Sequence, residues 1–95
     1  MLFAIIAHDA PAATELRMKT RPSHLAFIEK SGAMVKLGGA LLSPDGSAMI
    51  GSLIVIEAET LAAAEAWSAK DPYRTEGVFG DVEIRPYRLA IGALG

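Results

Sequence analysis

The 95-residue sequence contains no cysteine. This absence excludes disulfide bonds, thiolate zinc sites and a cysteine nucleophile together. Charged residues make up only 21% of the chain, and the formal net charge is −2. The chain therefore lacks the basic surface that attracts phosphate backbones or anionic membranes. We expect neither nucleic acid nor a membrane as a partner, and we expect a reducing, cytoplasmic location.

Long apolar runs are missing as well. No run approaches the roughly 20 residues that span a bilayer. The first apolar run, residues 2–7, meets His8 and Asp9 too soon for a signal peptide. Yet 52% of the residues are hydrophobic, more than a monomer of this size needs to fill its interior. We expect a single domain over residues 1–95 with apolar surface left for a second copy.

Short apolar runs between turn signals predict the strands. Asp45 and Gly46 follow one run and are typical of a hairpin turn, because glycine readily adopts positive φ. The run 53–56 is apolar at every position, which predicts a strand covered on both faces. The predicted strands are residues 2–7, 33–42, 49–58 and 81–89.

Cap residues predict the helices. Pro22 suits the first position of a helix and Gly32 suits the left-handed stop, so we predict a helix over 22–31. Thr60 can cap a second helix that runs to about residue 69. Residues 12–19 predict a short helix or an ordered loop.

The predicted order of elements is strand, helix, strand, strand, helix, strand. This is the βαββαβ order of ferredoxin-like α+β domains. Two helices can cover only one face of a four-stranded sheet, and the other face would expose residues 2–7 and 53–56. A second copy stacked on that face, related by two-fold symmetry, is the simplest solution.

This topology brings four segments to one pole of the domain. They are the ends of the first strand and second helix, the first turn of the first helix and the start of the third strand. His24 then lies near Asp71, whose carboxylate would orient the imidazole. A helix N-terminus would favour a neutral imidazole, and a neutral imidazole can act as a general base. Asp71 can equally cap the turn that follows it.

Several short motifs follow one another along nearly the whole chain. They are His8-Asp9, Arg17, Arg21-Pro22-x-His24-Leu25, Gly39, Gly51-Ser52, Asp71-Pro72-Tyr73, Gly77-x-Phe79 and Pro86-Tyr87. In this order the chain resembles the YciI-like (YCII-related) family. The resemblance implies a dimeric α+β barrel and a histidine and aspartate pair carried by His24 and Asp71. One branch of that family is similar in role to dehydrochlorinases that act on chlorinated hydroxymuconate.

The chain also departs from the family pattern. Ala10, Ala40 and Tyr87 stand where the family often has glycine, proline and tryptophan. These differences concern the shape of the substrate pocket more than the fold.

Four further residues are candidates for substrate binding. Arg17 and Arg21 could hold a substrate carboxylate, or could belong to a solvated basic edge. Ser52 could donate a hydrogen bond, and His8 could shape the pocket rim. A Ser52, His24 and Asp71 triad is disfavoured because no nucleophile elbow surrounds the serine.

No metal or cofactor is expected. The sequence lacks HxH, HxxxH and HExxH spacings and has no glycine-rich phosphate loop. We interpret the aromatic residues Trp67, Tyr73 and Phe79 as packing, because no basic residues interleave with them.

Two functions stay open at this point. The first is a small enzyme of the lyase, dehydrochlorinase or isomerase type, with His24 as general base on a small organic acid. The second is a non-catalytic small-molecule-binding or accessory domain that uses the same pocket. Both imply a small-molecule ligand and a homodimer or larger homo-oligomer.

Overall fold

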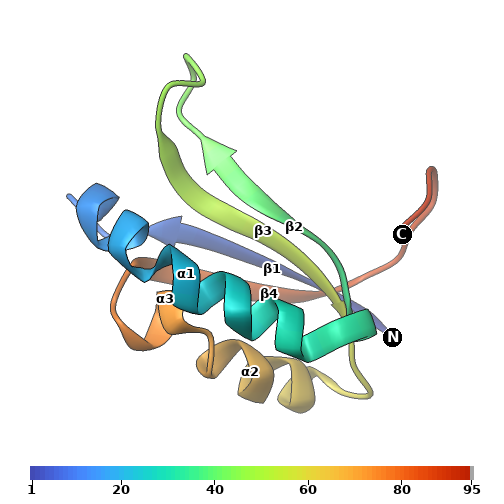
Figure 1. Ribbon diagram of the computed structural model, residues 1–95. Coiled ribbons are helices and arrows are strands. Elements are labelled where there is room, and N and C mark those ends of the chain that lie inside the picture. Colours follow the sequence, from blue (N-terminus) through green and yellow to red (C-terminus); the bar gives the residue numbers. More distant parts are fainter. Residues whose placement is uncertain (95) are drawn as a thin grey trace.

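A computed structural model describes residues 1–94. It is an α+β fold in which an antiparallel four-stranded sheet, in the order β2-β3-β1-β4, carries the helices on one face (Figure 1). The predicted ferredoxin-like βαββαβ fold is confirmed. The elements are β1 (Leu2–Asp9), α1 (Thr14–Ser31), the 3-10 turn η1 (Gly32–Met34), β2 (Val35–Leu42), β3 (Met49–Glu57), α2 (Leu61–Ala69), α3 (Pro72–Thr75) and β4 (Phe79–Tyr87).

The core lies between the sheet and the helices. Alternate strand residues point to the same face, so Phe3 and Ile5 of β1 lie beside Ile54 and Ile56 of β3 and pack under Ala64 of α2. A second cluster lies at the end of the sheet near α3. Its buried members are Ala7, Ala13, Tyr73, Val78 and Phe79.

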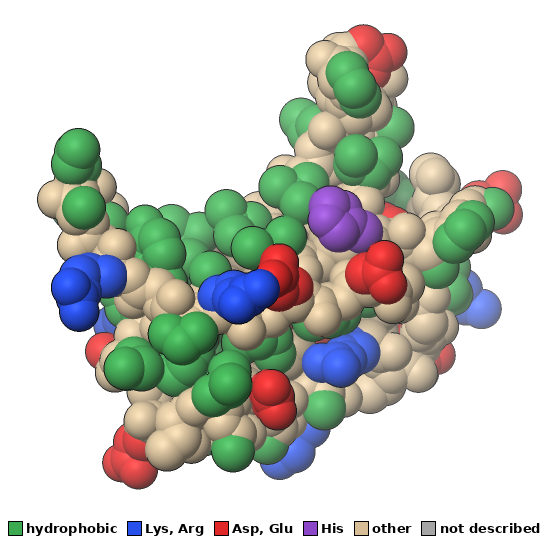
Figure 2. Space-filling view, turned by 180° about the vertical axis from the view of Figure 1, so that it is seen from behind, with side chains coloured by type: hydrophobic (Ala, Val, Ile, Leu, Met, Phe, Trp, Pro, Cys, Tyr) green, Lys and Arg blue, Asp and Glu red, His purple; other side chains and the backbone are tan. Residues whose placement is uncertain are grey.

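The opposite side of the sheet, here called the open face, carries no helix. Figure 2 shows hydrophobic side chains gathered on it, in the hollow between the projecting β2–β3 hairpin and the C-terminal end, with charged side chains beside them. The strand register assigns its apolar positions to Ala4, Ile6, Leu37, Leu53 and Val55. Both faces of β3 are therefore apolar, as the run 53–56 predicted.

Helix α1 begins at Thr14, so the predicted start at Pro22 is wrong. Pro22 lies inside the helix, where its missing N–H removes one backbone hydrogen bond. The first helical bond runs from Arg17 N to Ala13 O over 2.8 Å. Ala13 provides no side-chain cap, so the sequence carries no cap signal there. Residues 14–19, which the sequence left between helix and loop, are helical because burial of Arg17 and Thr20 anchors them.

The other boundaries agree more closely with the predictions. The hydroxyl of Thr60 accepts a hydrogen bond from Ala63 N over 3.1 Å and caps α2, as expected. Gly46 turns the β2–β3 hairpin with a φ of 77°. Strand β4 starts at Phe79 rather than Asp81, because Phe79 pairs with Asp9 beyond an irregularity in the ladder. No helix within residues 1–94 is both long enough and apolar enough to cross a membrane.

Candidate functional site

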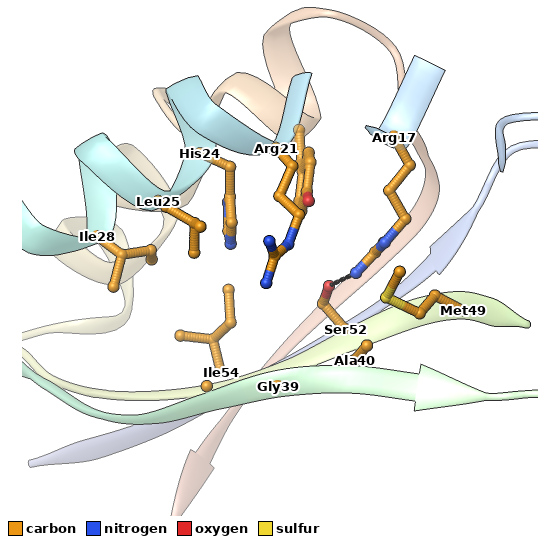
Figure 3. A pocket seen from close by; sticks show the side chains of 12 residues that line it. Arg17, Arg21, His24, Leu25, Ile28, Gly39, Ala40, Met49, Ser52 and Ile54 are labelled. Carbon is orange, nitrogen blue, oxygen red and sulfur yellow. Dashed lines mark hydrogen bonds between the residues drawn. The ribbon is translucent and has the colours of Figure 1, made fainter. Parts of the chain in front are cut away.

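One stripe of helix α1 faces the sheet across a cavity. Arg17, Arg21, His24 and Ile28 are spaced four, three and four residues apart, which places them on one side of the helix. The cavity between this stripe and strands β2 and β3 has a volume of about 230 Å³ (Figure 3). Its opposite wall includes Gly38 and Ala40 of β2 with Met49, Ser52 and Ile54 of β3.

His24 and Asp71 are in direct contact. Nδ1 of His24 lies 2.7 Å from Oδ1 of Asp71, and Asp71 is only 1% exposed. A carboxylate only accepts hydrogen bonds, so this contact requires a proton on Nδ1, and in the neutral form of the ring Nε2 is then the basic nitrogen. The predicted proximity of the two residues is confirmed, while their catalytic role stays a proposal.

Asp71 is held by the backbone as well. It is the N-cap of α3, and its Oδ1 accepts a hydrogen bond from Tyr73 N over 2.9 Å. The predicted capping function is therefore present together with the contact to His24. Because a short turn fixes the carboxylate, the orientation of the imidazole follows from local backbone geometry.

The prediction that a helix N-terminus acts on His24 is wrong. His24 lies ten residues after Thr14, where α1 begins. The electrostatic effect of a helix end falls off within the first turn. Asp71, and not the end of α1, is therefore the polar group that sets the tautomer of this histidine.

Tyr73 contacts both His24 and Arg17. Its ring stacks on His24 with centroids 3.9 Å apart and an interplanar angle of 10°. The guanidinium carbon of Arg17 lies 4.6 Å from the same ring centroid. Burial raises the pKa of the Tyr73 hydroxyl, while the nearby Arg17 and Arg21 offset part of that rise.

Tyr73 belongs to the site, although the sequence predicted only a packing role for it. Tyr73 is 2% exposed and lines the cavity. The signal that could have found it is its position two residues after Asp71, inside the Asp71-Pro72-Tyr73 motif.

Arg17 is buried, so the alternative of a solvated basic edge is wrong for this residue. It is 4% exposed. One terminal nitrogen donates to both oxygens of Asp9 at 2.8 and 3.1 Å. The other donates to Ser52 Oγ at 2.7 Å and to Gly51 O at 3.0 Å. Within residues 1–94, its Nε has no hydrogen-bond partner although it is buried.

The burial of this network also affects Asp9. Desolvation raises the pKa of the Asp9 carboxyl, and the charge and hydrogen bonds of Arg17 offset part of the rise. Gly51 allows the close approach on which the network depends. A Cβ there would collide with the carbonyl oxygen of Ala7.

The remaining candidates fall in two places. Arg21 extends from α1 into the cavity (Figure 3), in the interior of the helix rather than beside its N-terminus. The salt bridges found within residues 1–94 do not include Arg21. His8 is exposed and lies on the open face, opposite Asp81 of β4 in the strand register. The structure thus brings together His24, Asp71, Arg17, Arg21 and Ser52, and it does not bring His8 to the cavity.

Comparisons with known proteins agree with this fold. Residues 1–88 match the family described as the YCII-related domain. Protein YciI of Escherichia coli is 33% identical over 95 positions, which cover 93% of this chain and 97% of that protein. An uncharacterized protein of Haemophilus influenzae matches with the same identity and coverage.

A solved structure is similar as well. It is the 5-chloro-2-hydroxyhydroquinone dehydrochlorinase of Burkholderia phenoliruptrix in complex with 2,5-dihydroxybenzoquinone. The TM-score is 0.86 at 28% identity, over 95% of this chain and 96% of that chain.

Proposed function

Because this chain belongs to the YCII-related family, we propose that it is a small enzyme in which His24 transfers a proton and Asp71 orients it. The observation that carries the proposal is the contact of 2.7 Å between His24 Nδ1 and the buried carboxylate of Asp71. This contact leaves Nε2 as a base at the wall of the cavity.

The arrangement suits a general base for a simple reason. When Nε2 takes a proton, the ring becomes a cation beside a carboxylate that is already in place, so no group has to move to stabilise it. The Tyr73 ring, stacked at 3.9 Å, restrains the imidazole plane. Such a positioned base contributes about 100-fold to 10,000-fold to a reaction rate.

Arg21 supports a small anionic substrate. It enters the cavity with its guanidinium, which can bind a carboxylate or a phenolate through paired N–H groups. Arg17 lines the cavity as well, but its terminal nitrogens are occupied by Asp9, Gly51 and Ser52. We therefore assign the substrate to small organic acids, including acidic phenols.

The similar dehydrochlorinase acts on a chlorinated hydroxyhydroquinone, and the same class of step fits this cavity. In such an elimination the substrate loses HCl: its proton passes to Nε2 of His24, and chloride leaves with the electron pair of the C–Cl bond. The residues named here provide the proton acceptor and the anion site that this step needs.

The test is chloride release from 5-chloro-2-hydroxyhydroquinone, with a screen of small carboxylic acids alongside. His24→Ala and Asp71→Asn should each remove most of the turnover, and the double variant should lose little more, because the two residues act as one unit. Unfolding curves of the same variants show whether any loss follows the unfolded fraction. Full activity in His24→Ala would disprove the proposal, and binding without turnover would favour the binding-domain alternative.

We further propose that a second copy covers the open face and forms the homodimer that the sequence predicts. The support is the apolar character of positions such as Ile6, Leu53 and Leu37 on a face without helices (Figure 2). Light scattering should report twice the chain mass. Leu37→Glu should separate the copies, whereas Leu61→Glu, at an equally exposed position on α2 (41% against 40%), should not. A monomeric wild-type protein would contradict this proposal.

A further inference from the structure

The floor of the cavity is made of small residues that the fold itself does not require. Gly38 and Ala40 lie on the helix-facing side of β2, paired with Ile54 and Ser52. A glycine inside a strand costs stability, because its flexible backbone must be ordered and it offers no side chain to pack. A glycine at position 38 therefore needs a reason.

The usual reasons do not apply. Gly38 is not among the glycines of positive φ. A Cβ added there would have the Cγ1 atom of Ile54 as its nearest neighbour at 3.8 Å, an ordinary contact. Neither backbone conformation nor packing within residues 1–94 excludes a side chain at this position. The space that a side chain would fill belongs to the cavity.

An independent observation points to an anion in that space. Arg21 extends from α1 into the same cavity (Figure 3), and the salt bridges found within residues 1–94 do not include it. A guanidinium without a carboxylate partner can bind an oxyanion through paired N–H groups.

We propose that Gly38 and Ala40 form the floor of a slot for a single ring that carries an oxyanion, held between the β2 backbone and the His24 and Arg21 side of α1. This inference deepens the proposed function and rests on it. The cavity of about 230 Å³ is smaller than the ~300 Å³ at which pockets for drug-sized ligands begin. A single ring is therefore the fitting size, and Gly38 is the residue that determines specificity.

The experiment is titration calorimetry of the whole protein with 2,5-dihydroxybenzoquinone, a flat oxyanion. Gly38→Ala should weaken binding, and Gly38→Val should weaken it at least about tenfold, because each added methyl group occupies the slot. Ala48→Val is the control, since position 48 is exposed in the loop between β2 and β3 and does not line the cavity. It should change affinity less than about twofold. The midpoint of thermal unfolding is the folding control: Gly38 variants that unfold at or above the wild-type temperature are folded.

Two carboxylates test the occupied space at constant charge. Gly38→Val should weaken the binding of benzoate more than the binding of acetate, because only benzoate carries a ring that would reach the floor. The inference is overturned if Gly38→Val binds 2,5-dihydroxybenzoquinone as well as the wild type does, if the wild type does not bind it, or if Gly38→Val weakens benzoate and acetate equally. The chloride-release test with His24→Ala does not depend on any of these binding results. The two proposals can therefore fail separately.

Discussion

Two aspartate pairs that meet at Tyr73 have nearly the same geometry and different chemistry. The Arg17 and Asp9 pair is 2.8 Å long, and the His24 and Asp71 pair is 2.7 Å long. Both basic side chains come from one face of α1, two turns apart, and both aspartate side chains are less than a tenth exposed. A fixed distance therefore does not by itself decide what a pair can do.

The two pairs differ in the basic group that contacts the aspartate. A guanidinium keeps its proton at any working pH, and the terminal nitrogens of Arg17 are occupied by Asp9, Gly51 and Ser52. An imidazole can exchange a proton near neutral pH, and only one nitrogen of His24 is occupied by Asp71. The first pair therefore anchors α1 to the sheet, and the second is available for chemistry.

The largest expected effect comes from breaking the anchoring pair. Asp9→Asn leaves the Arg17 charge buried without its anion, which should lower the unfolding free energy by about 3 kcal/mol or more. Urea unfolding measures the change. The control is Glu83→Gln, because the Glu83 and Arg85 pair has side chains that are 52% and 70% exposed. An exposed pair should contribute less than about 1 kcal/mol. Equal losses in the two variants would contradict the anchoring function of Asp9.

The residue that joins the two pairs should give the next largest effect. Tyr73→Leu removes the ring that contacts both His24 and Arg17 and should cost about 2–3 kcal/mol of stability. Tyr73→Phe keeps the ring and should cost less. Nitrogen NMR of the His24 ring should show a proton on Nδ1 in the wild type and in Tyr73→Phe, and a mixture of tautomers in Tyr73→Leu. An unchanged spectrum in Tyr73→Leu would mean that Asp71 alone orients the ring.

Arg21 differs from Arg17, because it faces the cavity without a partner among the described salt bridges. Arg21→Ala should weaken the binding of 2,5-dihydroxybenzoquinone by about 1.5–3 kcal/mol, the value of a hydrogen bond to a charged group. Stability should change little, because the residue is exposed. Lys19→Ala, an exposed cation on the same helix, is the control for net charge. Unchanged affinity in Arg21→Ala would remove this residue from the site.

The smallest expected effect concerns an exposed aspartate in the β2–β3 hairpin. The Ser43 hydroxyl, with the amide and hydroxyl of Ser47, lowers the pKa of Asp45 from 3.8 to about 2. A lowered pKa stabilises the fold above pH 3.8, and this contribution is lost as the pH falls toward about 2. The stability difference between wild type and Asp45→Asn should therefore shrink between pH 5 and pH 2. A constant difference would show that the hairpin hydrogen bonds do not depend on this charge.

Local signals in the sequence predicted most of the fold. Apolar runs placed the four strands, Thr60 marked the start of α2, and Asp45 with Gly46 marked the hairpin. The prediction that His24 lies beside Asp71 is confirmed, although it rested on a helix that starts at Pro22, and His24 in fact lies in the interior of α1. Domain count, cytoplasmic location and the absence of a cofactor stay predictions.

Only the tertiary structure decided the start of α1, the burial of Arg17, the place of Tyr73 and the face on which His8 lies. Each depends on contacts between segments far apart in the chain. Arg17, for example, looks like a surface residue until Asp9 and Ser52 are seen beside it. Composition and spacing determine which elements form, because those preferences act over a few residues. The partner that makes a buried charge stable lies elsewhere in the chain, and folding alone brings it there.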